Sequence, residues 1–203
     1  GHLDKLLPKP SKVVKVKHHA AMPWINIQAF MGNISKKRGA SFRAMEMTIM
    51  SACRTSEVLN ATWNEVDLKS GVWTIPASRM KADKEHRVPI SNQLRDLLES
   101  SPRLEGNSYI FPGMRGGRPL SNMAMIVALR GMGFKELTMH GFRSTFRDWA
   151  GESTSHPRDV CEQALAHTLG NQVEAAYRRG DLFAKREKLM QDWADFLYSN
   201  RTD

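Results

Sequence analysis

Five side chains that can bind or protonate a phosphate share this chain with a tyrosine that can attack one. In chain order they are Arg54, Lys81, His140, Arg143 and His167, and the tyrosine is Tyr177. Guanidinium groups grip two phosphate oxygens at once, and an ammonium can protonate a leaving alkoxide. Tyrosine, with an unperturbed pKa of about 10, becomes a nucleophile when nearby cations favour its phenolate. The set therefore predicts phosphoryl transfer by side chains alone.

Each member of this set also has an ordinary structural role, which the sequence leaves open. The alternatives are a surface ion pair of Arg54 with Glu57, a solvated turn lysine at Lys81, a solvated helix face at His140 and Arg143, a helix end at His167 and a half-buried core residue at Tyr177. Phe142, Phe146 and Trp149 recur at helical spacing, which predicts an apolar stripe on the helix that begins at His140. We expect His140 and Arg143 to point together, away from that stripe.

The overall charge of the chain indicates a polyanionic partner. Its 203 residues include 30 Lys and Arg against 21 Asp and Glu, for a formal net charge of +9. The basic residues spread along the whole length, which indicates a basic surface more than a charged tail, so nucleic acid is the first candidate partner. Cys53 and Cys161 lack a CxxC pairing, and we expect free thiols in a reducing cytoplasm.

Several other classes of protein are disfavoured. No apolar run approaches the roughly 18 residues needed to span a bilayer, so no membrane partner is expected. His156, Cys161 and His167 do not fall at familiar metal-ligand spacings, and no nucleotide-binding loop accompanies the set. We therefore expect no metal and no cofactor. Ser144 lacks the flanking glycines of a nucleophile elbow, which disfavours a serine hydrolase.

The chain is expected to form one domain after a basic linker. Gly1-His2 resembles a tag remnant, and residues 1–20 are rich in lysine without usable periodicity, so we expect order to begin near Pro23-Trp24 and the domain to span 21–203. Helices are predicted at 41–50, 56–62, 92–98, 122–129 and almost continuously from 140 onward, with interruptions at Ser153-Thr154 and Gly170. Short strands are predicted at 66–68, 72–75 and 87–90. The fold class is thus mainly α with a small antiparallel β-sheet. Arg54 lies between two predicted helices, and Lys81 lies on the last strand connection.

The ordered set of Arg54, Lys81, His140-x-x-Arg143, His167 and Tyr177 resembles the active-site pattern of tyrosine recombinases, the phage integrase family. Longer strings are similar to the integrases of satellite prophages and pathogenicity islands: RMK at 79–81, HGFRSTFRDWA at 140–150, ALAH at 164–167 and AAYRRGD at 175–181. The likeness covers nearly the whole chain from about His18 onward. It implies the tyrosine recombinase catalytic-domain fold of DNA breaking-rejoining enzymes.

The resemblance also implies a function. It is site-specific DNA recombination, as in the integration and excision of prophages or genomic islands, with double-stranded attachment-site DNA as the substrate. Tyr177 would attack a DNA phosphate, form a 3′-phosphotyrosine and release a 5′-hydroxyl. The bond energy is stored in that link, so neither ATP nor a metal is required.

The remaining residues take their implied roles from the same resemblance. Arg54 and Arg143 would stabilise the charge of the transition state, with His167 as an additional donor to the phosphate. Lys81 would be the acid for the leaving oxygen, and His140 would assist proton transfer.

Family members of this type carry DNA-binding domains ahead of the catalytic one, and we expect those domains to be absent from this chain. For the full-length protein the resemblance implies a homotetramer on DNA, accessory DNA-bending or directionality proteins, and action in the bacterial cytoplasm at the nucleoid. The sequence departs from the family at Met50-Ser51-Ala52-Cys53 before Arg54, a stretch where Thr-Gly is common. That departure raises a question about the local backbone geometry.

Two other functions and one structural choice stay open. A type IB topoisomerase-like enzyme would share the chemistry but only nick and close DNA, and a catalytically silent DNA-binding regulator would keep the residues without using them. An apolar stripe near the end of the chain is predicted to pack on its own core, and the alternative is docking on a neighbouring protomer. Its members are Leu182, Phe183, Leu189, Met190, Trp193, Phe196 and Leu197.

Overall fold

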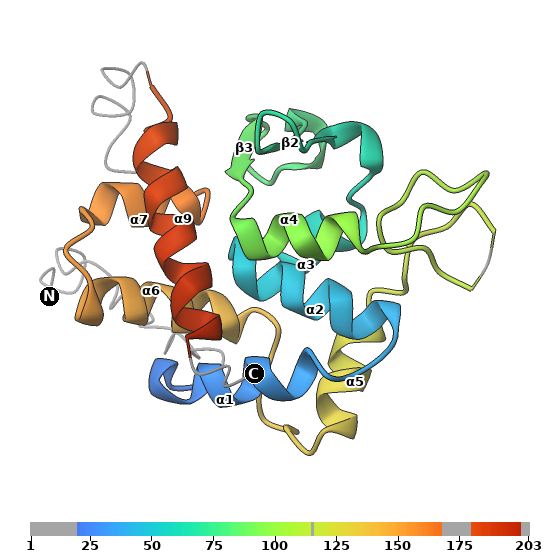
Figure 1. The fold of residues 1–203 in the computed structure, drawn as a ribbon, viewed down its shortest axis with the longest axis horizontal. Coiled ribbons are helices and arrows are strands. Elements are labelled where there is room, and N and C mark those ends of the chain that lie inside the picture. The colour runs from blue at the N-terminus through green and yellow to red at the C-terminus, as the bar shows by residue number, and fades with distance from the viewer. Residues whose placement is uncertain (1–19, 115, 168–179, 200–203) are drawn as a thin grey trace, which may run out of the picture.

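The computed structural model describes residues 20–114, 116–167 and 180–199, and this part of the chain is mostly helical (Figure 1). The helices are α1 (Ile27–Ile34), α2 (Ala40–Ser51), α3 (Thr55–Leu59), α4 (Asn92–Glu99), α5 (Ala124–Gly131), α6 (Gly141–Ser153), α7 (Arg158–Ala164) and α9 (Phe183–Tyr198). Short 3-10 turns span Trp24–Asn26, Trp63–Glu65 and Ala77–Arg79. None of the described helices is both long and apolar enough to cross a membrane.

A small antiparallel sheet lies beside α4, as predicted. Its strands are β1 (Val66–Asp67), β2 (Val72–Ile75) and β3 (His86–Pro89), paired in the order β1-β2-β3. On β2 the side chains of Trp73 and Ile75 are buried, whereas those of the alternate residues are half-buried, which is the period-2 pattern of a sheet with one face on the core. The connection from β2 to β3 carries Lys81.

Helix α9 packs on the core of its own chain, which confirms that prediction. It contacts α1, α2, α4, α7 and β3, and Figure 1 shows it crossing between the α6–α7 pair and the α4 side of the molecule. The ring of Trp193 lies 4.8 Å from that of Trp149 and 5.5 Å from that of Phe146 on α6. Its indole nitrogen donates a hydrogen bond to the Ile49 carbonyl at 2.9 Å. The apolar stripe of α6 is thus covered by the end of the chain.

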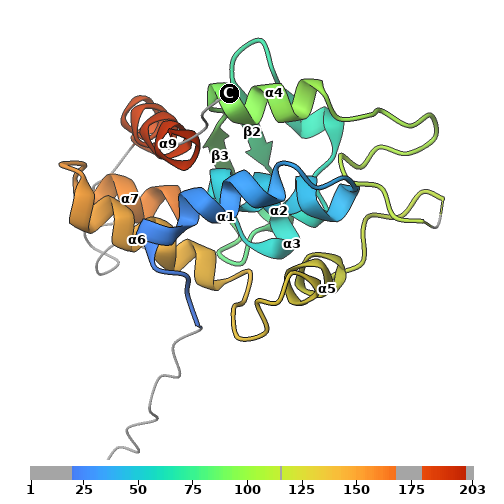
Figure 2. The same cartoon turned by 60° about the horizontal axis from the view of Figure 1, so that its bottom comes forward.

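The turned view brings helix α1, which the sequence analysis did not predict, across the front of α2 (Figure 2). Its buried residues are Ile27, Phe30, Met31 and Ile34, the i, i+3, i+4, i+7 pattern of an amphipathic helix. That helix is short, and the basic segment ahead of it masked its periodicity. Some predicted boundaries change: α3 ends at Leu59 and not at residue 62, and α5 spans Ala124–Gly131 and not 122–129. The interruption predicted at Ser153-Thr154 is confirmed, because α6 ends at Ser153 and α7 begins at Arg158.

Candidate active site

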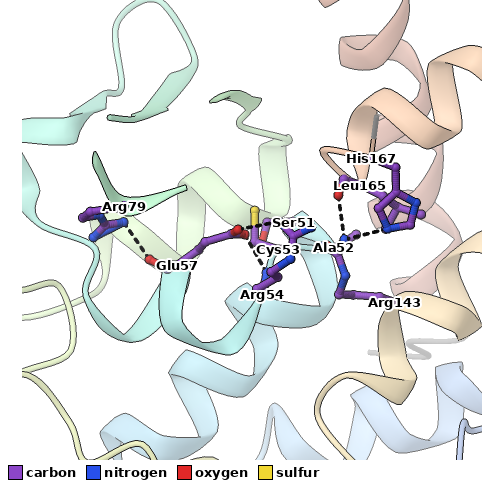
Figure 3. A network of polar contacts seen from close by, with 9 residues as sticks. All are labelled: Ser51, Ala52, Cys53, Arg54, Glu57, Arg79, Arg143, Leu165 and His167. Carbon is purple, nitrogen blue, oxygen red and sulfur yellow. Dashed lines mark hydrogen bonds and ion pairs between the residues drawn. The ribbon is translucent and has the colours of Figure 1, made fainter. Parts of the chain in front are cut away.

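Arg143 lies at the centre of a buried polar network that joins three helices (Figure 3). Its side chain projects from α6 and the residue is only 4% exposed. One terminal nitrogen donates to the carbonyl of Ala52, and the other donates to the carbonyl of Leu165 at 2.6 Å and lies 3.2 Å from His167 Nε2. The solvated-face interpretation of Arg143 is therefore wrong. His140 lies at the N-cap of α6 and is exposed, whereas Arg143, three residues later, is buried.

Both carbonyls that hold Arg143 belong to helix C-terminal ends. Ala52 caps α2, and Leu165 caps α7. Helix C-termini carry partial negative charge and unpaired carbonyl oxygens, so they can neutralise a buried cation without a carboxylate. Burial lowers the pKa of Arg143, with the positive charge of Arg54 adding to that effect against nearby acidic groups. A guanidinium still stays charged in a protein, so two helix ends hold a fixed cation here.

The structure shows the local backbone geometry before Arg54, where the sequence lacks the Thr-Gly that is common in the family. Ala52 adopts a left-handed conformation, with φ 51° and ψ 23°, and its N–H donates to the Ile49 carbonyl. An L-residue reaches this conformation at a cost that glycine does not have. The turn between α2 and α3 is thus formed with alanine, and it directs the Ala52 carbonyl to Arg143.

A Schellman motif at the end of α7 places His167. The N–H of His167 donates to the Glu162 carbonyl at 2.9 Å, and the N–H of Ala166 donates to the Gln163 carbonyl at 3.0 Å. Ala166 supplies the left-handed residue that this motif requires, with φ 48°. The chain therefore turns sharply after α7, and the imidazole of His167 returns toward Arg143.

Glu162 binds the other side of the His167 ring. Its carboxylate lies 2.6 Å from His167 Nδ1 and 2.9 Å from Arg147 Nε, and the residue is 8% exposed. Burial alone would raise the pKa of this carboxyl, but the hydrogen bond from His167 and the positive charge of Arg147 outweigh burial and hold the pKa below its ordinary value. Glu162 is therefore an anion at neutral pH.

Arg54 caps the start of α3 and is fixed there by Glu57. The carboxylate of Glu57 accepts from the backbone N–H of Arg54 at 2.7 Å and from its guanidinium at 2.8 Å. The pair is not the surface ion pair considered above, because Glu57 is only 2% exposed. Arg79 adds a donor at 2.9 Å to the Glu57 carbonyl (Figure 3). Arg54 is therefore held in one orientation, with part of its guanidinium open to solvent.

Cys53 directly precedes Arg54 in the chain, and its thiol is close enough to both Arg54 and Arg143 to feel their charges. Complete burial, together with the negative charge of Glu57, raises the pKa of its thiol to about 12. The thiol is thus neutral at physiological pH and adds no charge between Arg54 and Arg143. It serves as a small apolar spacer.

An open cleft of about 530 Å³ joins Arg54 to His140. Its walls are the start of α3, Asn60, the 119–122 segment and His140 at the N-cap of α6. The structure thus gathers Arg54, His140, Arg143 and His167 from three chain segments: the start of α3, the start of α6 and the turn after α7. Among the described residues, no group of three or more His, Cys, Asp or Glu side chains is arranged to hold a metal ion.

The other two predicted residues are not part of this cluster as described. Lys81 lies exposed on the turn between β2 and β3, and none of the described residues forms a hydrogen bond or ion pair with it. Tyr177 lies outside the described residues. Their predicted roles therefore stay predictions.

The sequence analysis missed three buried groups that surround the site: Glu162, His86 and Arg186. Burial and the positive charge of Arg186 lower the pKa of His86, on β3, to about 4. Arg186, on α9, donates to the Asp181 carboxylate at 2.8 Å and to the Arg87 carbonyl at 2.5 Å. These residues fasten α9 to the sheet. For Glu162 and Arg186 the signal in the sequence was a charged residue within an otherwise apolar helical pattern, and His86, on a strand, had no such signal.

Comparisons with known proteins agree on one family. A family model described as the phage integrase family matches residues 25–181. The integrase of Enterobacteria phage P4 is 32% identical over 92% of this chain and 47% of its own length. Prophage integrase IntA of Escherichia coli K12 is 36% identical over 73% of this chain and 37% of its own length. The chain thus spans about half or less of the relatives that it matches.

Solved structures show the same fold at low identity. An integrase from mycobacterium phage Brujita superposes with a TM-score of 0.65 at 16% identity, covering 92% of this chain and 61% of that one. A lambda integrase (75–356) dimer bound to a COC′ core site gives a TM-score of 0.58 at 16% identity, covering 78% and 62%. These likenesses confirm the predicted fold of a tyrosine recombinase catalytic domain.

Proposed function

This chain belongs to the phage integrase family, and we propose that it is the catalytic part of a site-specific DNA recombinase that acts through Tyr177. The observation that carries the proposal is the convergence of two fixed guanidinium groups, Arg54 and Arg143, with His167 and His140. Preorganised donors of this kind stabilise the charge that develops on a phosphate in the transition state. Their positions are set by helix ends and buried carboxylates before any substrate arrives.

The proposed reaction exchanges one phosphodiester for another. The phenolate oxygen of Tyr177 attacks the phosphorus, a bond forms between them, and the bond to the 5′-oxygen breaks. Lys81 donates a proton to that oxygen, while His140 assists the transfer of the phenol proton. The 5′-hydroxyl of a partner strand then attacks the 3′-phosphotyrosine and releases Tyr177. The proposed reaction requires no cofactor, because one phosphodiester bond is exchanged for another.

The proposed partner is double-stranded DNA. The net charge of +9 suits a polyanion. The lambda integrase structure with a similar fold is described as a dimer bound to a COC′ core site. A homotetramer on DNA, accessory bending or directionality proteins, and action in the bacterial cytoplasm complete the proposal for the longer protein.

Strand exchange can be tested with two duplexes of different length, each carrying the candidate attachment sequence and one fluorescent label. Incubation without metal or nucleotide should produce a recombinant duplex of intermediate length that carries both labels. Relaxation of supercoiled plasmid without joined product would favour the nicking-closing alternative. Binding with neither product, by a protein that retains the upstream domains, would favour the silent regulator.

A further inference from the structure

We propose that Glu162 is a positioning residue that allows His167 to change from a hydrogen-bond acceptor for Arg143 into a donor to the substrate phosphate. This inference rests on the proposed function. It concerns the protonation and hydrogen bonds of His167 in the free site, and how a bound phosphate would change them.

The two neighbours of His167 determine its protonation in the free site. A carboxylate can only accept, so the 2.6 Å contact with Glu162 requires a proton on Nδ1. A guanidinium can only donate, so the 3.2 Å contact with Arg143 requires an unprotonated Nε2. The free ring is therefore neutral, with its proton on Nδ1. In that state His167 cannot donate from Nε2.

A substrate phosphate changes the second of these contacts. Its oxygens compete with Nε2 for the N–H groups of Arg143 and bring negative charge to a site where Arg143 and Arg147 are the facing cations of α6. Once Arg143 donates to the phosphate, Nε2 can take a proton from solvent and donate to a phosphate oxygen. The ring then carries a positive charge, with Nδ1 still bound to Glu162.

The carboxylate of Glu162 favours that second proton. It lies against the ring at hydrogen-bond distance and its side chain is 10% exposed, so solvent screens the attraction only weakly. Arg147 at 2.9 Å and Arg158 at the start of α7 offset part of its charge, but the contact with His167, at 2.6 Å, is shorter than the contact with Arg147. The Schellman turn holds the ring in place, because the His167 N–H is fixed to the carbonyl of the same Glu162 residue.

The test compares the wild type with Glu162→Gln, which keeps the size and an acceptor but removes the charge, and with Glu162→Asp. Glu187→Gln is the matched control, since Glu187 is an exposed carboxylate on α9. The measurement is the rate of covalent adduct formation with a nicked DNA duplex from pH 6 to pH 9, together with DNA affinity. We expect Glu162→Gln to be roughly 10-fold slower at pH 7.5 with unchanged affinity, and its rate to decline with rising pH at a lower pH than in the wild type. Glu162→Asp should regain part of the rate.

A rate and pH profile in Glu162→Gln equal to those of Glu187→Gln would overturn the inference. If the wild type itself forms no adduct, the proposed function fails, whereas the state of His167 beside Glu162 is still tested by NMR without any reaction, which separates the two failures. A second measurement does not depend on whether the Glu162 variants fold. It determines the tautomer of His167 in the wild-type chain by ¹⁵N NMR, with the His167 signals assigned by comparison with His167→Gln. We expect the Nδ1–H tautomer at pH 8, and a proton on Nε2 instead would contradict the inference.

Discussion

Arg143 Nη2 lies 2.6 Å from the carbonyl oxygen of Leu165 at the C-terminal end of α7. A buried arginine usually requires a carboxylate, but a carboxylate beside this one would repel the phosphate that it is proposed to bind. Helix carbonyls neutralise the cation with partial charges and leave the net charge of the site positive. Arg143 would therefore contribute both to the stability of the fold and to the proposed binding of phosphate.

Replacement of Arg143 should affect both properties. In Arg143→Ala the carbonyls of Ala52 and Leu165 lose their donor, so we expect a loss of about 3 kcal/mol in the free energy of unfolding. Arg143→Lys keeps the charge but not the forked geometry, and we expect at least a roughly 100-fold slower adduct formation. Urea unfolding and adduct kinetics measure the two effects, with exposed Arg130→Ala on α5 as the control. An active, equally stable Arg143→Ala would refute this assignment.

Glu57 is expected to affect stability and the cleavage rate by holding the side chain of Arg54 in place. Glu57→Gln retains the shape but replaces a charge-assisted contact with a neutral one, so we expect about 1–2 kcal/mol lower stability and a roughly 10-fold slower cleavage step. The exposed Glu105→Gln carries the same change of charge and should behave as the wild type. Equal cleavage rates in the two variants would show that Arg54 does not depend on its buried partner.

The buried His86 should make the fold sensitive to mild acid. Its pKa of about 4 in the folded state lies below the unfolded value of about 6.5, so between these values the unfolded chain binds more protons and stability falls as pH falls. The loss begins near pH 6.5, reaches about 3 kcal/mol at pH 4, and then levels off. Urea unfolding at pH 7.5, 6 and 5 should therefore show a shallower loss in His86→Gln than in the wild type. Parallel curves would indicate that His86 binds its proton equally well in the folded and unfolded chain.

The left-handed backbone at Ala52 predicts a stabilising substitution. Ala52→Gly removes the steric cost of φ 51° but adds chain entropy to the unfolded state, for a net gain of up to about 1 kcal/mol. Ala128→Gly within α5 should instead lose about 1 kcal/mol, since glycine weakens a helix interior. Thermal unfolding of the two variants should shift in opposite directions. A destabilised Ala52→Gly would mean that the turn is not strained.

The sequence predicted the sheet and most of the helices because their periodicity is local. Trp73 and Ile75 alternate with less buried neighbours, and Phe142, Phe146 and Trp149 recur at helical spacing, so each pattern is complete within one element. The position of Arg54 at a helix start was also predictable from the break around it. The alternative of a solvated face at Arg143 was wrong, because its side chain is buried against the C-terminal ends of α2 and α7.

Other parts of the site could not be predicted from the sequence. The acceptors of Arg143 are backbone carbonyls of Ala52 and Leu165, which have no signature in residue type. The partner of His167 is Glu162, five residues earlier, and the two meet only because Ala166 takes a left-handed conformation. Contacts made by tertiary packing and by one unusual backbone angle leave no periodic trace.

The most direct test of the account is the covalent link itself. The chain is incubated, without metal or nucleotide, with a nicked suicide duplex that carries candidate attachment-site sequence, and protein–DNA adducts that resist SDS are measured for the wild type, Tyr177→Phe and Tyr109→Phe. The account predicts an adduct in the wild type and in Tyr109→Phe and none in Tyr177→Phe, with the linked residue identified as Tyr177 by mass spectrometry. An adduct that persists in Tyr177→Phe, or none from a verified site even with the upstream domains restored, would contradict it.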